Sequence, residues 1–167
     1  AIWTETQLPG DAPAVQDLDF WNASIGYAVG SFGYAVRSSD GGLTWQILPT
    51  PDNTDQLTDI ALIGADELWV STAGGRVLYS NTGGLNWAVM DAGAAGFGSF
   101  STIVATPAGD AWIAGWQGAI RHFSGPPPPP VNQPPAASFT FLTTGLAVSL
   151  TDTSSDADGT IVSWLWS

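Results

Sequence analysis

Few side chains in this sequence are suited to catalysis, and they do not gather into one pattern. The chain carries three arginines (Arg37, Arg76 and Arg121), one histidine (His122) and only two glutamates. Three arginines beside a tyrosine nucleophile would suit a sialidase-type glycosidase. These arginines, however, do not occupy equivalent positions of the sequence repeats, and no acid–base pair or Ser–His–Asp arrangement can be assembled around His122. The sequence therefore predicts no catalytic residues and a protein that is not an enzyme.

Three aspartates near the C-terminus form a cluster of hard oxygen ligands. Asp152, Asp156 and Asp158 are close in sequence, and the run from Asp156 to Gly159 resembles a calcium-binding turn. An acidic turn whose side chains accept hydrogen bonds from their own backbone explains the same residues, and we favour it. Calcium is the one cofactor that the sequence leaves open.

Aromatic residues flanked by glycine are the better candidates for binding. Phe32 and Trp116 fall in the turns between the second and third predicted strands of the first and third repeats. Such residues can stack on sugar rings, anchor a partner protein or fill a gap between subunits. With Arg121 and His122, they are the predicted contacts to a ligand or partner.

The charge balance excludes two classes of partner. Three arginines and no lysine stand against 15 Asp and Glu, which gives a net charge of −12. Such a surface repels the phosphates of nucleic acids and of anionic membranes. No run of about 18 apolar residues is present, so no membrane span is expected. The absence of lysine beside abundant Gly, Thr, Ser, Asn and Trp is typical of an exported surface protein, whereas the absence of cysteine does not indicate a compartment.

Three sequence repeats of about 42 residues predict the architecture. Equivalent residues recur every 42 or 43 positions in four columns: Trp3, Trp45 and Trp87; Leu18, Ile60 and Ile103; Tyr27, Trp69 and Trp112; Gly33, Gly75 and Gly118. Within the second repeat, short β-rich segments at 57–62, 67–72, 76–80 and 87–90 are separated by glycine-rich turns. Four antiparallel strands at this spacing are typical of a propeller blade. We therefore predict an all-β fold with three β-propeller-type, four-stranded blades.

One glycine-rich motif points to a known family. The run Ser38-Ser-Asp-Gly-Gly-Leu-Thr-Trp45 resembles the Asp-box, Ser-x-Asp-x-Gly-x-Thr-Trp, of BNR-repeat β-propellers. The longer stretch 26–45 resembles the photosystem II assembly-factor branch of that family, and the resemblance extends over residues 1–125. It implies a propeller fold and, in that branch, binding of a partner protein through an arginine-rich face. Three arginines in a chain of charge −12 argue against such a face.

The box is expected to shape a turn and to have no catalytic or metal-binding role. Its aspartate can accept N–H bonds within the turn, its glycines allow positive φ, and its tryptophan can be buried between sheets. The second repeat has Thr82 in place of the aspartate, and the third ends at Gly125 without a box. The predicted structural box residues are Ser38, Asp40, Gly42, Thr44, Trp45, Ser80, Gly84 and Trp87.

A proline-rich segment separates the repeats from a C-terminal β segment. Five consecutive prolines, Pro126 to Pro130, favour an extended polyproline II spacer. Beyond it, 137–141, 146–150 and 160–164 alternate as strands. The run from Asn132 to Trp164 resembles the start of a PKD domain, an Ig-like β-sandwich. We predict a three-repeat region at 1–125, a linker at 126–136 and a partial PKD-like sandwich segment at 137–167.

The resulting functional hypothesis is a secreted protein of the cell surface that acts in adhesion or structure. Three blades fall short of the four to eight that usually close a ring, and residues 3–8 resemble the last strand of a blade, so we expect this segment to pair with the open edge near Ile120. The expected partners are further copies of the chain, in a homo-oligomer or filament, other surface proteins or glycans. Two alternatives are an assembly factor that binds a partner protein and a carbohydrate-binding or sialidase-like propeller fragment.

Overall fold

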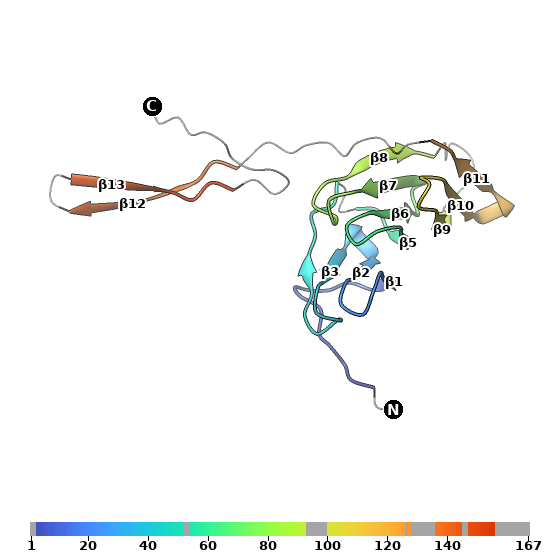
Figure 1. The fold of residues 1–167 in the computed structure, drawn as a ribbon, viewed down its shortest axis with the longest axis horizontal. Helices are drawn as coiled ribbons and strands as arrows, with labels where there is room; N and C mark the ends of the chain where they lie inside the picture. The colour runs from blue at the N-terminus through green and yellow to red at the C-terminus, as the bar shows by residue number, and fades with distance from the viewer. Residues whose placement is uncertain are drawn as a thin grey trace. The chain divides into compact units, whose positions relative to one another are not determined.

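The computed structural model describes residues 3–51, 54–92, 100–125, 127, 136–144 and 147–155 of the 167-residue chain. Contacts divide the chain into two units, Ala1–Val131 and Asn132–Ser167. The first unit carries the three sequence repeats, and the second carries a β-hairpin (Figure 1).

The first unit consists of three antiparallel sheets, each formed by one repeat. Blade 1 has the order β1 (Val15–Phe20), β2 (Gly26–Gly30), β3 (Ala35–Ser38) and β4 (Gln46–Ile47). Blade 2 has the order β5 (Leu57–Leu62), β6 (Leu68–Thr72), β7 (Arg76–Ser80) and β8 (Ala88–Asp91). Blade 3 has three described strands, β9 (Phe100–Ala105), β10 (Ala111–Gly115) and β11 (Ile120–Phe123), with β10 in the middle. The prediction of an all-β fold built from four-stranded propeller blades is confirmed.

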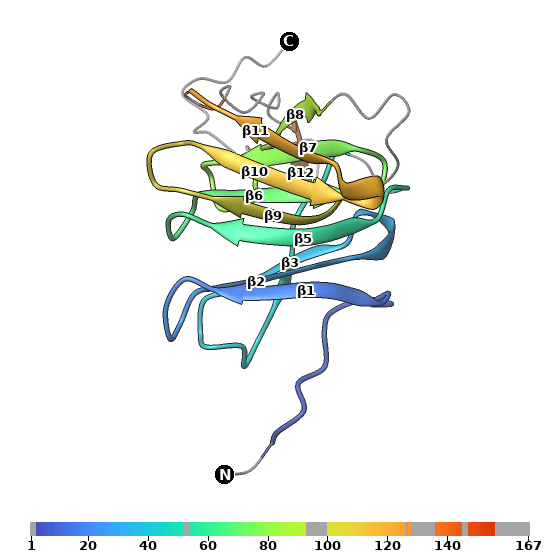
Figure 2. The same cartoon turned by 90° about the vertical axis from the view of Figure 1, so that its right-hand side faces the viewer.

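The blades stack face to face with their inner strands β1, β5 and β9 side by side (Figure 2). Blade 2 lies between the other two blades, and every residue of its strand β6 is buried, as is every residue of β2 in blade 1. The β6 sequence Leu-Trp-Val-Ser-Thr does not alternate between apolar and polar residues. A sheet that is buried on both sides reads as a continuous run and not as a period of two. The inner strands show the difference between the blades, because β1 of blade 1 has mostly exposed residues and β5 of blade 2 has no exposed residue.

The inner strands of neighbouring blades are joined by a repeated carboxylate contact. The Oδ2 atom of Asp17 accepts a hydrogen bond from the Ile60 amide at 3.0 Å. One blade further, the Oδ2 atom of Asp59 accepts a hydrogen bond from the Ile103 amide at 2.6 Å. Burial, together with the neighbouring Asp17, raises the pKa of Asp59. Asp17 and Asp59 thus each accept a hydrogen bond from a backbone amide of the next blade, whose inner strand is not paired with the strand of the aspartate.

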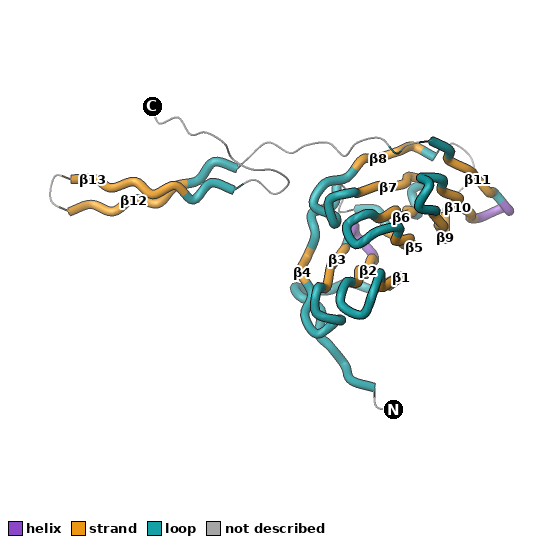
Figure 3. Tube along the Cα trace, in the orientation of Figure 1, coloured by secondary structure: helices purple, strands orange, loops and turns teal. Residues whose placement is uncertain are grey.

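Helical structure in the described residues is limited to two 3-10 turns, η1 (Ser31–Gly33) and η2 (Trp116–Gly118), drawn in purple in Figure 3. Accordingly, the described part of the chain has no helix with the length and apolar character to cross a membrane.

The N-terminal segment does not form the predicted closing strand. Residues 3–8 belong to no strand, and Trp3 is fully exposed. The Tyr34 hydroxyl donates to the Pro9 carbonyl at 2.8 Å, which holds this part of the chain against blade 1. Blades 1 and 3 lie at opposite ends of the stack (Figure 2), so pairing of residues 3–8 with the edge near Ile120 is a wrong prediction for this structure.

The second unit is a hairpin of β12 (Phe139–Thr144) and β13 (Ala147–Asp152), in register from Phe139 opposite Asp152 to Thr144 opposite Ala147. Its apolar side chains Phe141, Leu142 and Val148 are more than half exposed. Two strands alone cannot cover an apolar face, which is why an isolated hairpin is only marginally stable. The third predicted strand of this segment, at 160–164, lies outside the described residues.

Candidate partner-binding site

The three arginines are held in three separate settings. Arg37 bridges from blade 1 to blade 2, where its Nη2 atom lies 2.7 Å from Asp66 Oδ1, and its Nε–H donates to the Tyr27 hydroxyl at 2.9 Å. Arg76 pairs with Asp55 of its own blade at 3.1 Å. Arg121 lies on β11 and lines a pocket. Arg37 and Arg76 therefore serve the blades themselves, and the geometry offers no arginine clamp for a ligand carboxylate.

The Asp-box of blade 1 is a closed hydrogen-bonded turn between β3 and β4. Asp40 accepts hydrogen bonds from the Thr44 amide at 2.9 Å and from its hydroxyl at 2.5 Å. Ser38 donates to Asp40 at 2.8 Å and accepts from the Gly42 amide at 2.9 Å. The bonds from Thr44, followed by the bond from Ser38, lower the pKa of Asp40 to about 2. These hydrogen bonds all join groups of the same turn, so the role of Asp40 is to stabilise the turn.

The box of blade 2 keeps the same turn with a hydroxyl in place of the carboxylate. The Thr82 Oγ1 atom accepts the Asn86 amide at 2.9 Å, as Asp40 accepts that of Thr44. Ser80 again accepts from a glycine amide, that of Gly84, at 2.9 Å. A shorter, neutral acceptor therefore suffices for the turn, although it makes fewer bonds than a carboxylate can.

The tryptophans that end the two boxes have different surroundings. Trp87 of blade 2 is only 6% exposed and packs in the core between blades 1 and 2. Its indole N–H donates to the Pro49 carbonyl of blade 1 at 2.6 Å. Trp45 is half-buried and meets Phe20 of its own blade edge to face, with the ring centroids 6.0 Å apart. A box tryptophan thus reaches toward the preceding blade, and the described chain has no blade before blade 1.

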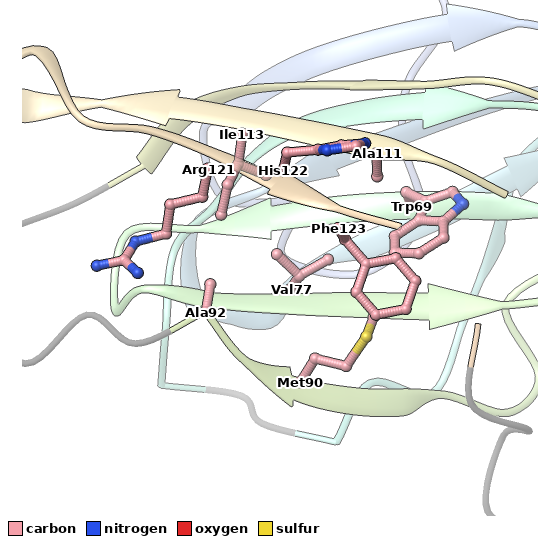
Figure 4. A pocket seen from close by; sticks show the side chains of 9 residues that line it. All are labelled: Trp69, Val77, Met90, Ala92, Ala111, Ile113, Arg121, His122 and Phe123. Atoms are coloured by element: carbon pink, nitrogen blue, oxygen red, sulfur yellow. The ribbon is translucent and has the colours of Figure 1, made fainter. Parts of the chain in front are cut away.

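A pocket of about 360 Å³ lies between blades 2 and 3. Figure 4 shows Met90 and Phe123 together on one side of it and Arg121 on another. The side chains of Arg121 and Phe123 are half-buried, while their neighbours on β11 are exposed. The pocket is lined by Trp69, Val77, Met90, Ala92, Ala111, Ile113, Arg121, His122 and Phe123.

The four predicted contact residues fall into two groups. Arg121 and His122 are adjacent on β11 and belong to the pocket lining, and the His122 ring also stacks on Trp112 with centroids 4.5 Å apart. Phe32 and Trp116 lie in the turns η1 and η2 and are 69% and 67% exposed. Phe32 has a positive φ of 57°, and Gln117 in the middle of η2 has a φ of 59°, so this conformation belongs to the turn that both blades share.

The predicted calcium ligands are only partly described. Asp152 accepts hydrogen bonds from the Ser154 hydroxyl at 2.7 Å and the Ser154 amide at 3.1 Å, which is the local capping expected of an acidic turn. Asp156 and Asp158 lie outside the described residues. Within the described ranges, no three His, Cys, Asp or Glu side chains are grouped in a way that could hold a metal ion.

The pocket itself was not predicted from the sequence. Its walls come from residues such as Trp69, Met90 and Phe123, which are ordinary core residues by type. The available signal was the repeat register: adding 43 to Trp87 gives Pro130, so the third repeat has proline where a box tryptophan would stand.

Comparison with known proteins gives a consistent result. The model of the family described as photosynthesis system II assembly factor YCF48 matches residues 1–125. A solved structure described as YCF48 bound to D1 peptide is similar with a TM-score of 0.62 and 26% identity, over 70% of this chain and 38% of that one. YCF48 from Cyanidioschyzon merolae is similar with a TM-score of 0.63 and 27% identity, over 73% of this chain and 40% of that one. The chain thus spans about two-fifths of the length of these structures. No functionally curated protein matches it.

These comparisons overturn three predictions made from the sequence. The extracellular adhesive or structural role is wrong, because the matching family consists of photosystem II assembly factors. The cell-surface location is wrong for the same reason. Self-assembly and glycan binding are wrong as the partner prediction, because the similar solved structure holds a peptide of another protein. Composition misled here, since a lysine-free acidic surface limits the choice of partners without naming a location.

Proposed function

The chain belongs to the photosynthesis system II assembly factor YCF48 family, and we propose from this that it is an assembly factor that binds a segment of a partner protein. The observation that carries the proposal is the family match over residues 1–125, which includes all three blades. The peptide held by the similar solved structure makes a peptide of D1 the first candidate partner. In this role the protein presents a binding surface and catalyses no reaction.

The geometry supports binding on blade 3 and the neighbouring turns. Blade 3 offers a pocket, a guanidinium at Arg121 and the exposed ring of Trp116 within one stretch of chain. Large aromatic side chains and arginine are the residues that most often dominate protein interfaces. We propose Trp116, Arg121, His122 and, on blade 1, Phe32 as the partner contacts.

The remaining parts of the chain have accessory roles in this proposal. We place the blade region at 1–125, a proline-rich spacer at 126–136 and a PKD-like segment at 137–167. The hairpin of β12 and β13, with its exposed apolar faces, is consistent with part of a β-sandwich that other strands complete. Asp152 accepts hydrogen bonds from Ser154 within its own turn, and calcium binding by Asp152, Asp156 and Asp158 stays a prediction.

Fluorescence anisotropy with the full chain and a fluorescein-labelled D1 peptide tests the proposal. We expect saturable binding, and no saturable binding of a scrambled peptide of the same composition. Trp116→Ala should weaken binding about fivefold or more, as truncation of an interface aromatic does. Leu43→Ala is the matched control, because Leu43 is also an exposed apolar residue (73%) but lies in the Asp-box turn. Equal binding of the two peptides would refute the proposal.

A further inference from the structure

The pocket between blades 2 and 3 corresponds, position by position, to a place that is filled between blades 1 and 2. Six of its lining residues, moved back by 42 or 43 positions, give members of the core between blades 1 and 2. The pairs are Trp69 and Tyr27, Val77 and Ala35, Met90 and Leu48, Ala111 and Leu68, Ile113 and Val70, and Arg121 and Leu78. In the first interface these residues pack with the indole of Trp87. In the third repeat, the sequence position equivalent to Trp87 is that of Pro130, 43 residues later.

The residues that follow β11 are poorly suited to complete blade 3. Five of the seven residues after Phe123 are prolines. A proline has no N–H to donate to a neighbouring strand. Gly125 and Pro127 lie against Gly109, in the turn between β9 and β10. Among the described strands, β11 is the edge strand of a three-stranded sheet, whereas its counterparts β3 and β7 pair with β4 and β8.

The size and chemistry of the pocket suit an aromatic side chain. Its volume is about 360 Å³, and its walls are mainly apolar or aromatic. An apolar cavity of about 150 Å³ is already enough to bind benzene. An extended peptide beside β11 would meet an edge that no described strand covers, and a pocket for one of its side chains, which is how peptides bind by strand addition.

One substitution in the pocket wall specifies the charge of the occupant. Leu78 in the filled interface is 2% exposed, and its counterpart in the pocket is the half-buried Arg121. Leu78 lies opposite Val89 in the pairing of β7 with β8. A residue added at the Val89 position beside β11 would therefore face Arg121. A carboxylate there gives the opposite-charge cross-strand pair that stabilises neighbouring strands.

We infer that blade 3 binds an extended segment of a partner protein as a fourth strand, with a tryptophan or similar aromatic side chain in the pocket and an acidic residue opposite Arg121. This inference deepens the proposed function and rests on it for the nature of the partner.

The single methionine of the chain, Met90, lies in the pocket wall and gives a specific probe. In the full chain labelled with a methionine ¹³C-methyl group, we expect one pocket resonance. A synthetic peptide that copies residues 81–91 contains the strand and indole that fill the first interface. It should shift this resonance in a saturable way, and the same peptide with alanine for tryptophan should bind about tenfold more weakly or worse, as expected for one lost buried aromatic group.

Three further measurements decide between outcomes. The Ala92→Trp variant, checked for an unchanged circular dichroism spectrum, should lose the peptide response because its own indole occupies the pocket.

The peptide with aspartate at the Val89 position should bind about two- to fivefold more tightly to the wild type, and Arg121→Leu should abolish that gain. Equal binding of the tryptophan and alanine peptides, or no shift at Met90, would overturn the inference. A shift that grows with protein concentration alone would also overturn it, because a second copy would then be the occupant.

Since this probe peptide copies the chain's own blade 2 and shares no segment with D1 by design, the two proposals fail separately. Binding of the D1 peptide without any response at Met90 would retain the assembly function and reject the pocket as its site. A Met90 response to the tryptophan peptide without D1 binding would retain the pocket and reject the proposed partner.

Discussion

The two interfaces between blades share the contact between inner strands and differ in their outer parts, where only the first is filled by a tryptophan. Between blades 1 and 2, Trp87 fills the core and donates a hydrogen bond to the Pro49 carbonyl. Between blades 2 and 3, the equivalent residues line a pocket of about 360 Å³. Both interfaces keep the aspartate contact between inner strands, from Asp17 to Ile60 and from Asp59 to Ile103. The contact between inner strands is therefore kept both where a tryptophan fills the outer part of the interface and where a pocket lies there.

The largest expected effect comes from emptying the filled interface. Trp87→Ala removes a buried indole and its hydrogen bond, and should lower the free energy of unfolding by about 3–5 kcal/mol. Urea unfolding followed by far-UV circular dichroism measures this change. Trp45→Ala is the matched control and should have a clearly smaller effect, because Trp45 is only half-buried. Similar losses for both variants would show that Trp87 is not a specific filler of the first interface.

A second, smaller effect is expected at the inner strands. Asp59→Ala leaves the part-buried Ile103 amide without its acceptor, which should lower the free energy of unfolding by about 1–3 kcal/mol at pH 4. The pKa of Asp59 is raised in the folded state. The protonated side chain therefore stabilises the fold, and that contribution is complete below the unfolded pKa and is lost as pH rises through the folded pKa. The difference between wild type and variant should accordingly shrink at higher pH, and a difference that grows with pH would contradict the assignment.

The Asp-box of blade 1 should show the opposite pH dependence. The pKa of Asp40 falls from 3.8 to about 2 on folding. Its contribution to stability is thus present above pH 3.8 and is lost as pH falls toward 2. Melting temperatures of wild type and Asp40→Ala should differ at neutral pH and converge near pH 2. Blade 2, with Thr82 in this place, contributes no such dependence, so Thr82→Ala should lower the melting temperature equally across this range.

The smallest expected effect makes the second interface resemble the first. Arg121→Leu introduces the residue that its counterpart Leu78 already provides, and the free energy of unfolding should change by less than about 1 kcal/mol. Chemical denaturation of the two proteins side by side gives the comparison. A loss of several kcal/mol would mean that Arg121 is needed for the fold and is not available for recognition.

The repeat spacing predicted the blades well because it reflects a local rule. Each strand, turn and box lies within one repeat, so residues such as Ser38, Gly42 and Thr44 indicate their turn by type and order alone. The pocket could not be predicted in the same way, because it depends on a residue that is missing. The sequence places Pro130 where a tryptophan would complete the interface, and only the stacked blades show that Met90, Ile113 and Phe123 then line a free volume.

The partner was mispredicted for a different reason. A charge of −12 limits which surfaces the protein can approach, but it does not distinguish an acidic adhesin from an acidic assembly factor. Likewise, three repeats with an open edge are compatible both with self-association and with capture of another protein's strand. The family match favours an assembly factor with a partner protein, a choice that local residue chemistry could not make.

Hydrogen–deuterium exchange of the full chain with and without the D1 peptide tests the central claim most directly. If a partner strand adds to blade 3, the amides of β11 (120–123) become protected, while those of β4 (46–47) and β8 (88–91) exchange as before. Protection confined to the turns at Phe32 and Trp116, with β11 unchanged, would contradict strand addition at the open edge of blade 3.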